Sequence, residues 1–141
     1  NVSLLFVGTL NIAGGYLFYR ATGHAWVLVL FVLAGLGAIG AGLFPLTTGD
    51  LHSIFALFAF VFFNLEAIAC ALVVRGPMRL ISAMAGVVGI GFVVVMVIGD
   101  AGYPAVFGPM GHGGAERMIV YPVMFWLMAF GGYLLAGRSE A

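Results

Sequence analysis

The chain alternates between long apolar runs and short connections that are polar or rich in glycine. About 17 to 25 consecutive apolar residues are needed for a helix to cross a bilayer. Five runs reach that length, and the spans that they predict are Val2–Tyr19, Ala25–Phe44, Leu51–Val74, Leu80–Ile98 and Met118–Ala136. The last connection, residues 99–115, is expected to be a long Gly-rich loop. The pattern predicts an all-α, polytopic membrane bundle that forms a single domain over residues 1–141.

Charged residues are rare, and their positions predict an orientation. They make up 7% of the chain, whereas soluble globular proteins contain about 25%. Five arginines balance five acidic residues, and this zero net charge argues against a nucleic-acid partner. Four arginines lie at one set of helix ends, and they are Arg20, Arg75, Arg79 and Arg138, while Arg117 alone lies at the other. Because cytoplasmic loops are enriched in arginine, we expect Asn1 outside and the C-terminus in the cytoplasm.

The third expected span carries a carboxylate in its middle. Asn64 and Glu66 interrupt this apolar run, and Asn11 lies within the first span. A charge near mid-membrane costs roughly 2.5–3.5 kcal/mol on the insertion scale, so Glu66 needs a partner. His52 falls on the same helix face but about 21 Å away along the axis, which is too far for contact. Glu66 is therefore either a functional carboxylate or a protonated one that is hydrogen-bonded to Asn11, to a serine or to a backbone carbonyl.

A second group of polar residues gathers at the opposite, outer ends of the spans. Its members are Asp50, His52, Asp100, His112, Glu116 and Arg117. Asp50, His52 and His112 are candidate ligands for a divalent metal such as zinc. His52, His112, Asp100, Glu116 and Arg117 are candidate catalytic residues that could supply a general base and acid. No His-x-x-x-His, HExxH or serine-elbow motif supports either site, and no cofactor is specified.

The outer residues also have a purely structural interpretation. Asp100 follows the fourth span, where a carboxylate opposes the helix dipole, and Arg117 is the basic residue expected at that face. An Asp100–Arg117 ion pair would resolve the conflict. Asp50 would then cap the third helix and Glu116 would complement the dipole of the fifth. A haem held by His52 and His112 is a weaker alternative, because a Gly-rich loop anchors an axial ligand poorly.

Small residues predict how the helices pack and which partners they meet. Ala34, Ala38 and Gly42 recur at four-residue spacing, as in faces that bring two membrane helices together. The expected partners are the lipid bilayer and, through such Gly/Ala faces, a second copy or other membrane subunits. Cys70 is the single cysteine, which excludes a disulfide framework and a zinc site built from cysteines.

Several glycine, aromatic and charged positions resemble a known family. They are Gly42, Phe44 and Pro45 before His52, then Gly113, Glu116 and Arg117, then Tyr121-Pro122, Trp126, Gly131 and Leu134–Leu135. Over nearly the whole chain this pattern resembles the archaeal and bacterial membrane protein family known as domain of unknown function 998. The resemblance implies a six-helix fold and recurring positions at His52, Glu116 and Arg117. It does not indicate an activity. The Ser-x-Leu-Gly-type motif that follows the first helix of the family would correspond to Asn1–Leu4, where this sequence departs from the pattern, so the first of the six helices is expected to be absent from this chain.

Three classes of function are compatible with these residues. The first is a non-catalytic module of the cell membrane, such as an accessory subunit of a larger membrane complex. The second is a membrane-embedded hydrolase that acts on a lipid at the outer surface with the His, Asp and Glu residues described above. The third is a small-molecule or proton-coupled carrier that uses Glu66. The first is favoured, because the ion-pair interpretation explains the outer polar residues without any chemistry.

Overall fold

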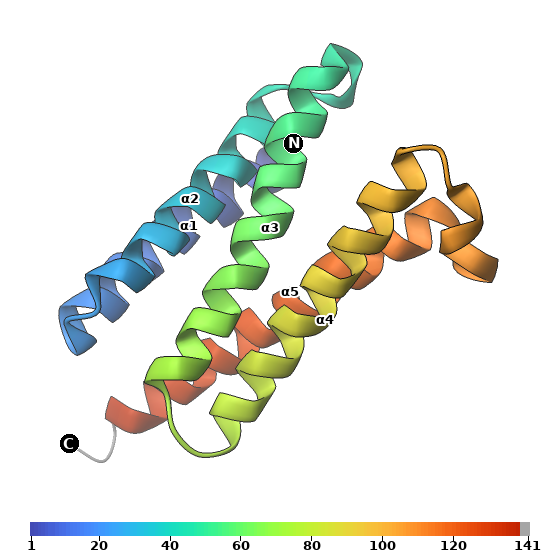
Figure 1. The fold of residues 1–141 in the computed structure, drawn as a ribbon. Helices are drawn as coiled ribbons and strands as arrows, with labels where there is room; N and C mark the ends of the chain where they lie inside the picture. Colours follow the sequence, from blue (N-terminus) through green and yellow to red (C-terminus); the bar gives the residue numbers. More distant parts are fainter. Residues whose placement is uncertain (139–141) are drawn as a thin grey trace. The chain divides into compact units, whose positions relative to one another are not determined.

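A computed structural model describes residues 1–138 of the chain, and these residues form five long α-helices and two short 3-10 helices (Figure 1). In order they are α1 (Val2–Thr22), α2 (Ala25–Leu43), η1 (Leu46–Thr48), α3 (Asp50–Val73), α4 (Pro77–Asp100), η2 (Pro104–Met110) and α5 (Gly111–Arg138). No β-strand occurs in this part of the chain. Five helical segments are long and apolar enough to cross a membrane. The predicted all-α, multi-pass membrane fold is confirmed.

The largest difference from the expected boundaries lies before the last span. Residues 99–115 are expected to form a loop, but α4 continues to Asp100, η2 follows, and α5 begins at Gly111 instead of Met118. Glycine in a helix costs about 1 kcal/mol relative to alanine, so a run with Gly111, Gly113 and Gly114 predicts a loop. Ala115 and Ile119 are completely buried, however. Packing of this early turn of α5 outweighs its poor helix propensity.

The described residues cluster into two compact units, whereas the sequence predicts a single domain. The first unit is Asn1–Glu66 and the second begins at Ala67. The boundary falls inside α3, so this continuous helix contributes its first part to one unit and its last turns to the other. The two units are described separately below.

In the first unit, α1 and α2 form a helical hairpin that turns at Gly23. Gly23 has φ = 75°, a left-handed conformation that ends α1, and its N–H donates to the carbonyl of Tyr19 at 2.8 Å. α2 starts two residues later, at Ala25. The short turn makes α1 and α2 antiparallel neighbours along their length (Figure 1).

The contact between α1 and α2 depends on two facing glycines. A Cβ built on Gly8 would lie 2.5 Å from the carbonyl oxygen of Gly35, and a Cβ on Gly35 would lie 2.6 Å from the carbonyl oxygen of Gly8. Neither position can hold a larger residue unless the helices separate. On α2, Ala34 and Ala38 of the predicted small-residue face are buried, with exposed fractions of 0% and 1%. The helices approach backbone to backbone, as interfaces of small residues allow in membranes.

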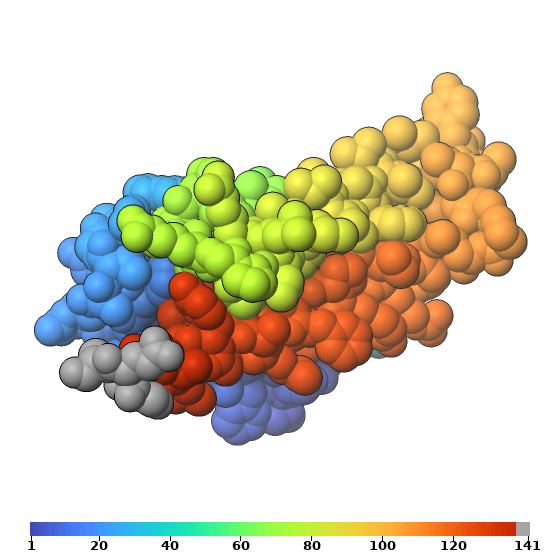
Figure 2. All heavy atoms as spheres, turned by 90° about the horizontal axis from the view of Figure 1, so that it is seen from below, coloured from blue at the N-terminus to red at the C-terminus, as the bar shows by residue number. Residues whose placement is uncertain are grey.

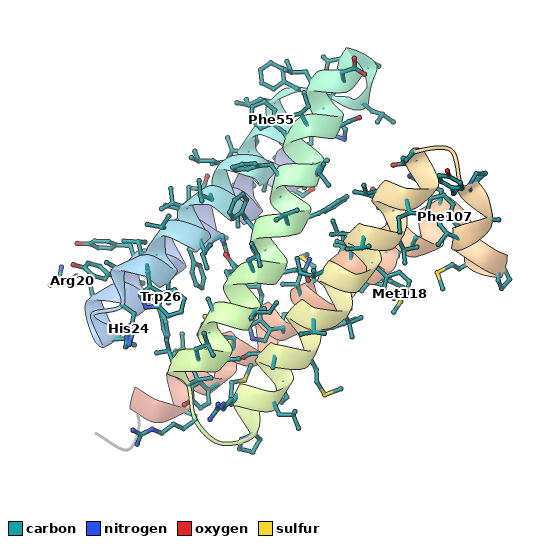
Figure 3. All side chains as sticks on the ribbon, viewed as in Figure 1. Arg20, His24, Trp26, Phe55, Phe107 and Met118 are labelled. Atoms are coloured by element: carbon teal, nitrogen blue, oxygen red, sulfur yellow. The ribbon has the colours of Figure 1, made fainter. Side chains whose placement is uncertain are left out.

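The other side of α2 packs on α3 in the same way. A Cβ on Gly37 would lie 2.6 Å from the backbone nitrogen of Ala59, and a Cβ on Gly40 would overlap the ring of Phe55. Phe55 (Figure 3) also stacks on Phe44 at the end of α2, with ring centroids 5.4 Å apart. Glycines on two sides of α2 therefore let it pack tightly against α1 and α3 at once.

In the second unit, α4 and α5 lie side by side (Figure 2). Trp126 of α5 is 1% exposed, and its Nε1–H donates to the Ser82 hydroxyl of α4 at 2.7 Å. The Ser82 hydroxyl in turn donates to the carbonyl of Met78 at 2.7 Å. This chain of hydrogen bonds gives both buried polar side chains a partner, which a protein interior requires.

The position of η2 is set by one aromatic residue. Phe107 is 7% exposed, and its ring fills the space above Gly99 on the last turn of α4, where any Cβ would overlap it. The ring also meets the imidazole of His112 edge to face, with centroids 5.2 Å apart. Phe107 thereby joins η2 to the end of α4 and the start of α5.

The glycine contact between α1 and α2 can be tested with two alanine substitutions on the same helix. Gly8→Ala should lower the free energy of unfolding by about 1–3 kcal/mol, because the methyl group overpacks the contact with Gly35. Gly14→Ala is the matched control, since nothing lies within 4 Å of its Cβ position. The control should be unchanged or more stable by up to about 1 kcal/mol, owing to helix propensity. Unfolding in detergent micelles, followed by circular dichroism, gives both values. Equal effects at both positions would contradict the close approach.

Candidate functional site

The first unit contains a buried hydrogen-bond cluster in which three helices meet. Glu66 of α3 is 0% exposed, and its Oε2 accepts a hydrogen bond of 2.9 Å from Nδ2 of Asn11 in α1. The same Asn11 nitrogen donates to the backbone carbonyl of Phe31 in α2 at 3.1 Å. Asn11 itself is 6% exposed. One amide group therefore joins α1 to both α2 and α3.

The second oxygen of Glu66 has a different environment. Oε1 is buried and has no hydrogen-bond partner among the described residues. Among the described residues, no arginine or histidine forms an ion pair with the carboxyl group of Glu66. Chemically, the free oxygen can hold a proton or accept a hydrogen bond from a bound molecule.

Asn64, two residues earlier in α3, does not join this cluster through its amide nitrogen. It is 0% exposed, and Nδ2 donates to the carbonyl of Phe60 in the same helix at 2.8 Å. This intrahelical bond gives the Asn64 amide nitrogen a hydrogen-bond partner within its own helix. Of the three intramembrane polar residues that the sequence singles out, Asn11 and Glu66 bond to each other and Asn64 bonds to its own helix.

The six outer residues divide between the two units. In the first, Asp50 is the exposed first residue of α3, and His52 is half-buried two residues later in the same turn. Nδ1 of His52 lies 2.7 Å from the carbonyl oxygen of Phe44. Because a carbonyl oxygen only accepts, Nδ1 is the donor. Nε2 is then the ring atom of His52 that remains to act as a base or a metal ligand.

In the second unit, His112 pairs with Asp100. Nε2 of His112 lies 3.1 Å from Oδ1 of Asp100, with both side chains more than half exposed. The Asp100–Arg117 ion pair suggested by the sequence is not found among the described residues. The reason is the early start of α5, which puts His112 in its first turn. Arg117 follows five residues later, about 7.5 Å further along the helix axis.

The remaining outer residue, Glu116, lies one helical turn beyond His112 and is exposed, as is Arg117. Within the described part of the chain, no three His, Cys, Asp or Glu side chains gather in a group that could hold a metal ion. The metal candidates are divided, with Asp50 and His52 in the first unit and His112 in the second. Within the described part of the second unit, the arrangement offers a two-residue His–Asp pair.

Two contacts in the second unit are not predicted from the sequence. Ser82 stands in an otherwise smooth apolar helix, and the weak signal that a buried tryptophan needs a hydrogen-bond acceptor could have linked it to Trp126. The contact between the Phe107 ring and Gly99 has no signal in the sequence, since it depends on how η2 folds back onto the end of α4.

Comparison with known proteins adds one match. The sequence description of one family, "Protein of unknown function (DUF998)", matches residues 1–133 of the chain. No curated protein and no solved structure matches the chain.

The geometry at the outer end of the second unit predicts a contrast between its polar and apolar contacts. Asp100→Asn should change the free energy of unfolding by less than about 1 kcal/mol, because exposed ion pairs contribute little. Phe107→Ala should lower it by about 3 kcal/mol, since it empties a buried site. Denaturant unfolding of the two variants in micelles makes the comparison. A larger loss for Asp100→Asn than for Phe107→Ala would show that the His112–Asp100 pair holds this end together.

Proposed function

Because the chain belongs to the DUF998 family, whose description assigns no activity, we propose that it is a non-catalytic helical module of the cell membrane. It would act as an accessory subunit beside other membrane chains. The observation that carries this proposal is the hydrogen bond between Asn11 and Glu66. The proposed orientation follows the arginine distribution, with Asn1 outside and the C-terminus in the cytoplasm.

The Asn11–Glu66 bond gives the intramembrane carboxyl group a structural task. Glu66 is the only buried charged residue among those with described side chains, and its partner is an amide in the same unit. Hydrogen bonds between membrane helices contribute about 0.6 kcal/mol on average and up to about 1.7 kcal/mol. A contact of that size is enough to fix how α1 and α3 cross. The bond supports a packing role for Glu66, the residue that most suggests chemistry.

The small residues also support the role of an accessory module. The faces that contain Gly35, Ala38 and Gly37 are used inside the first unit, so they are closed to a partner chain. By contrast, Gly91 on α4 and Gly132 on α5 have nothing within 4 Å of their Cβ positions. A partner helix could approach the backbone closely at such open glycines.

The outer residues give less support to a lipid hydrolase. The His112–Asp100 pair is exposed to solvent, and the described residues do not add a third His, Cys, Asp or Glu to it. A nucleophile or a metal-bound water normally completes such a site.

The structural role of Glu66 is tested by comparing an isosteric with a truncating substitution. Glu66→Gln should leave the free energy of unfolding within about 1 kcal/mol of the wild type, because its amide oxygen can still accept from Asn11. Glu66→Ala should lower it by about 1–3 kcal/mol, since Asn11 loses an acceptor in a buried place. Adding Asn11→Ala to each variant completes a double-mutant cycle, and the coupling energy should be larger in the cycle with Glu66→Ala, which removes the acceptor, than in the cycle with Glu66→Gln, which keeps it. Equal losses for Gln and Ala would contradict the hydrogen-bond role.

One observation favours a second candidate function, a proton-coupled carrier. Oε1 of Glu66 lacks a partner among the described residues, so it is the place in the first unit where a proton or a small hydrogen-bond donor could bind. Vesicles that contain the purified protein and a pH-sensitive dye distinguish the two candidates. A proton flux that is driven by a membrane potential and abolished by Glu66→Gln, in a variant as stable as the wild type, would establish the carrier function in place of the non-catalytic module. The module predicts the same flux as in protein-free vesicles.

A further inference from the structure

The segment between α4 and α5, residues 101–110, has an unusual surface. It contains no charged residue, and its sequence is AGYPAVFGPM. Tyr103, Val106 and Met110 are 70%, 40% and 47% exposed. Large apolar side chains that point outward together normally mark a surface that meets something other than water.

This exposure is built into the fold, because the segment is held at several points. Phe107 (Figure 3) is buried against Gly99. The His112–Asp100 pair joins the helix ends on either side of the segment. Gly108, at φ = 54° and ψ = −148°, bends the backbone inside η2 in a conformation that residues with a side chain rarely adopt. One aromatic side chain is thus turned inward while its apolar neighbours remain outside.

The exposed side chains continue a surface that already faces lipid. On the last turns of α4, Val94, Val97 and Ile98 are 53%, 50% and 41% exposed, and on α5 Tyr121 is 51% exposed. Both helices are long and apolar enough to cross a membrane, so these side chains meet hydrocarbon. In Figure 2 the orange segment lies at the end of the two helices and projects beyond them.

We propose that residues 101–110 form an interfacial segment, which lies in the headgroup region of the bilayer and places Tyr103, Val106 and Met110 in contact with lipid. Tyrosine is enriched at this level of the membrane, because its ring is apolar and its hydroxyl meets water. A segment that contains no charged residue fits the membrane interface better than bulk water. Water in the headgroup region can still hydrate its backbone. Zwitterionic lipid is sufficient, since the segment has no charge with which to select anionic lipid. This inference does not depend on the proposed function.

Site-directed spin labelling of the full chain in phosphatidylcholine vesicles tests the proposal. Nitroxide labels are attached to Tyr103→Cys and Met110→Cys in a Cys70→Ala background, which removes the one native, buried thiol. Collisions with oxygen, which partitions into lipid, are compared with collisions with a water-soluble nickel complex. Val94→Cys on α4 is the lipid reference, and Arg75→Cys in the turn after α3 is the aqueous reference. All four sites are exposed, so each variant should fold.

The expected oxygen-to-nickel ratio at both segment positions lies between the two references and closer to Val94→Cys than to Arg75→Cys. A ratio equal to that of Arg75→Cys would mean that the segment stands in water and would overturn the proposal. Low collision rates with both reagents would overturn it too, because they would place protein over the segment instead of lipid. As a control for an intact structure, each labelled variant should have the same midpoint of denaturant unfolding as the wild type.

Discussion

An amide nitrogen has two hydrogens to donate, and Asn11 donates toward two helices other than its own. One contact reaches the carbonyl of Phe31 in α2 and the other reaches the carboxyl group of Glu66 in α3. Inside a membrane there is little hydrophobic force to bring apolar helices together, so polar contacts of this kind decide which faces meet. The rotation of each of the three helices about its own axis is constrained by this one side chain. The packing of the first unit depends on that constraint.

Glycine makes the constraint geometrically feasible. Asn11 can reach both partners only if α1, α2 and α3 approach closely, and Gly8, Gly35 and Gly37 remove the side chains that would prevent it. The second unit uses a different solution. There Trp126 fills the space between α4 and α5 and finds its hydrogen-bond acceptor in Ser82. Close backbone contact joins the helices of one unit, whereas a large side chain with a polar anchor joins those of the other.

The parts of this structure that could be predicted are those that depend on local pattern. Apolar run length alone indicates the five spans, and the spacing of Ala34 and Ala38 indicates a packed face. Asn11 is one of several acceptable partners for Glu66, but the choice among them depends on how two helices cross, which no periodicity records. The start of α5 is missed because local propensity opposes it and the burial of Ala115 decides. The partner of Asp100 is missed as a consequence, since one helix boundary determines which basic residue stands nearby.

The sequence separation between Asn11 and Glu66 has a consequence for biosynthesis. The two residues are 55 positions apart, and a ribosome that adds about 5–20 residues per second needs about 3–11 s to cover that distance. Throughout this interval the amide of Asn11 has no carboxyl group of α3 with which to pair. α1 is also the least apolar of the five candidate spans. On its own α1 therefore gains the least from transfer into lipid, and we expect α2 or the insertion machinery to retain it until α3 is inserted.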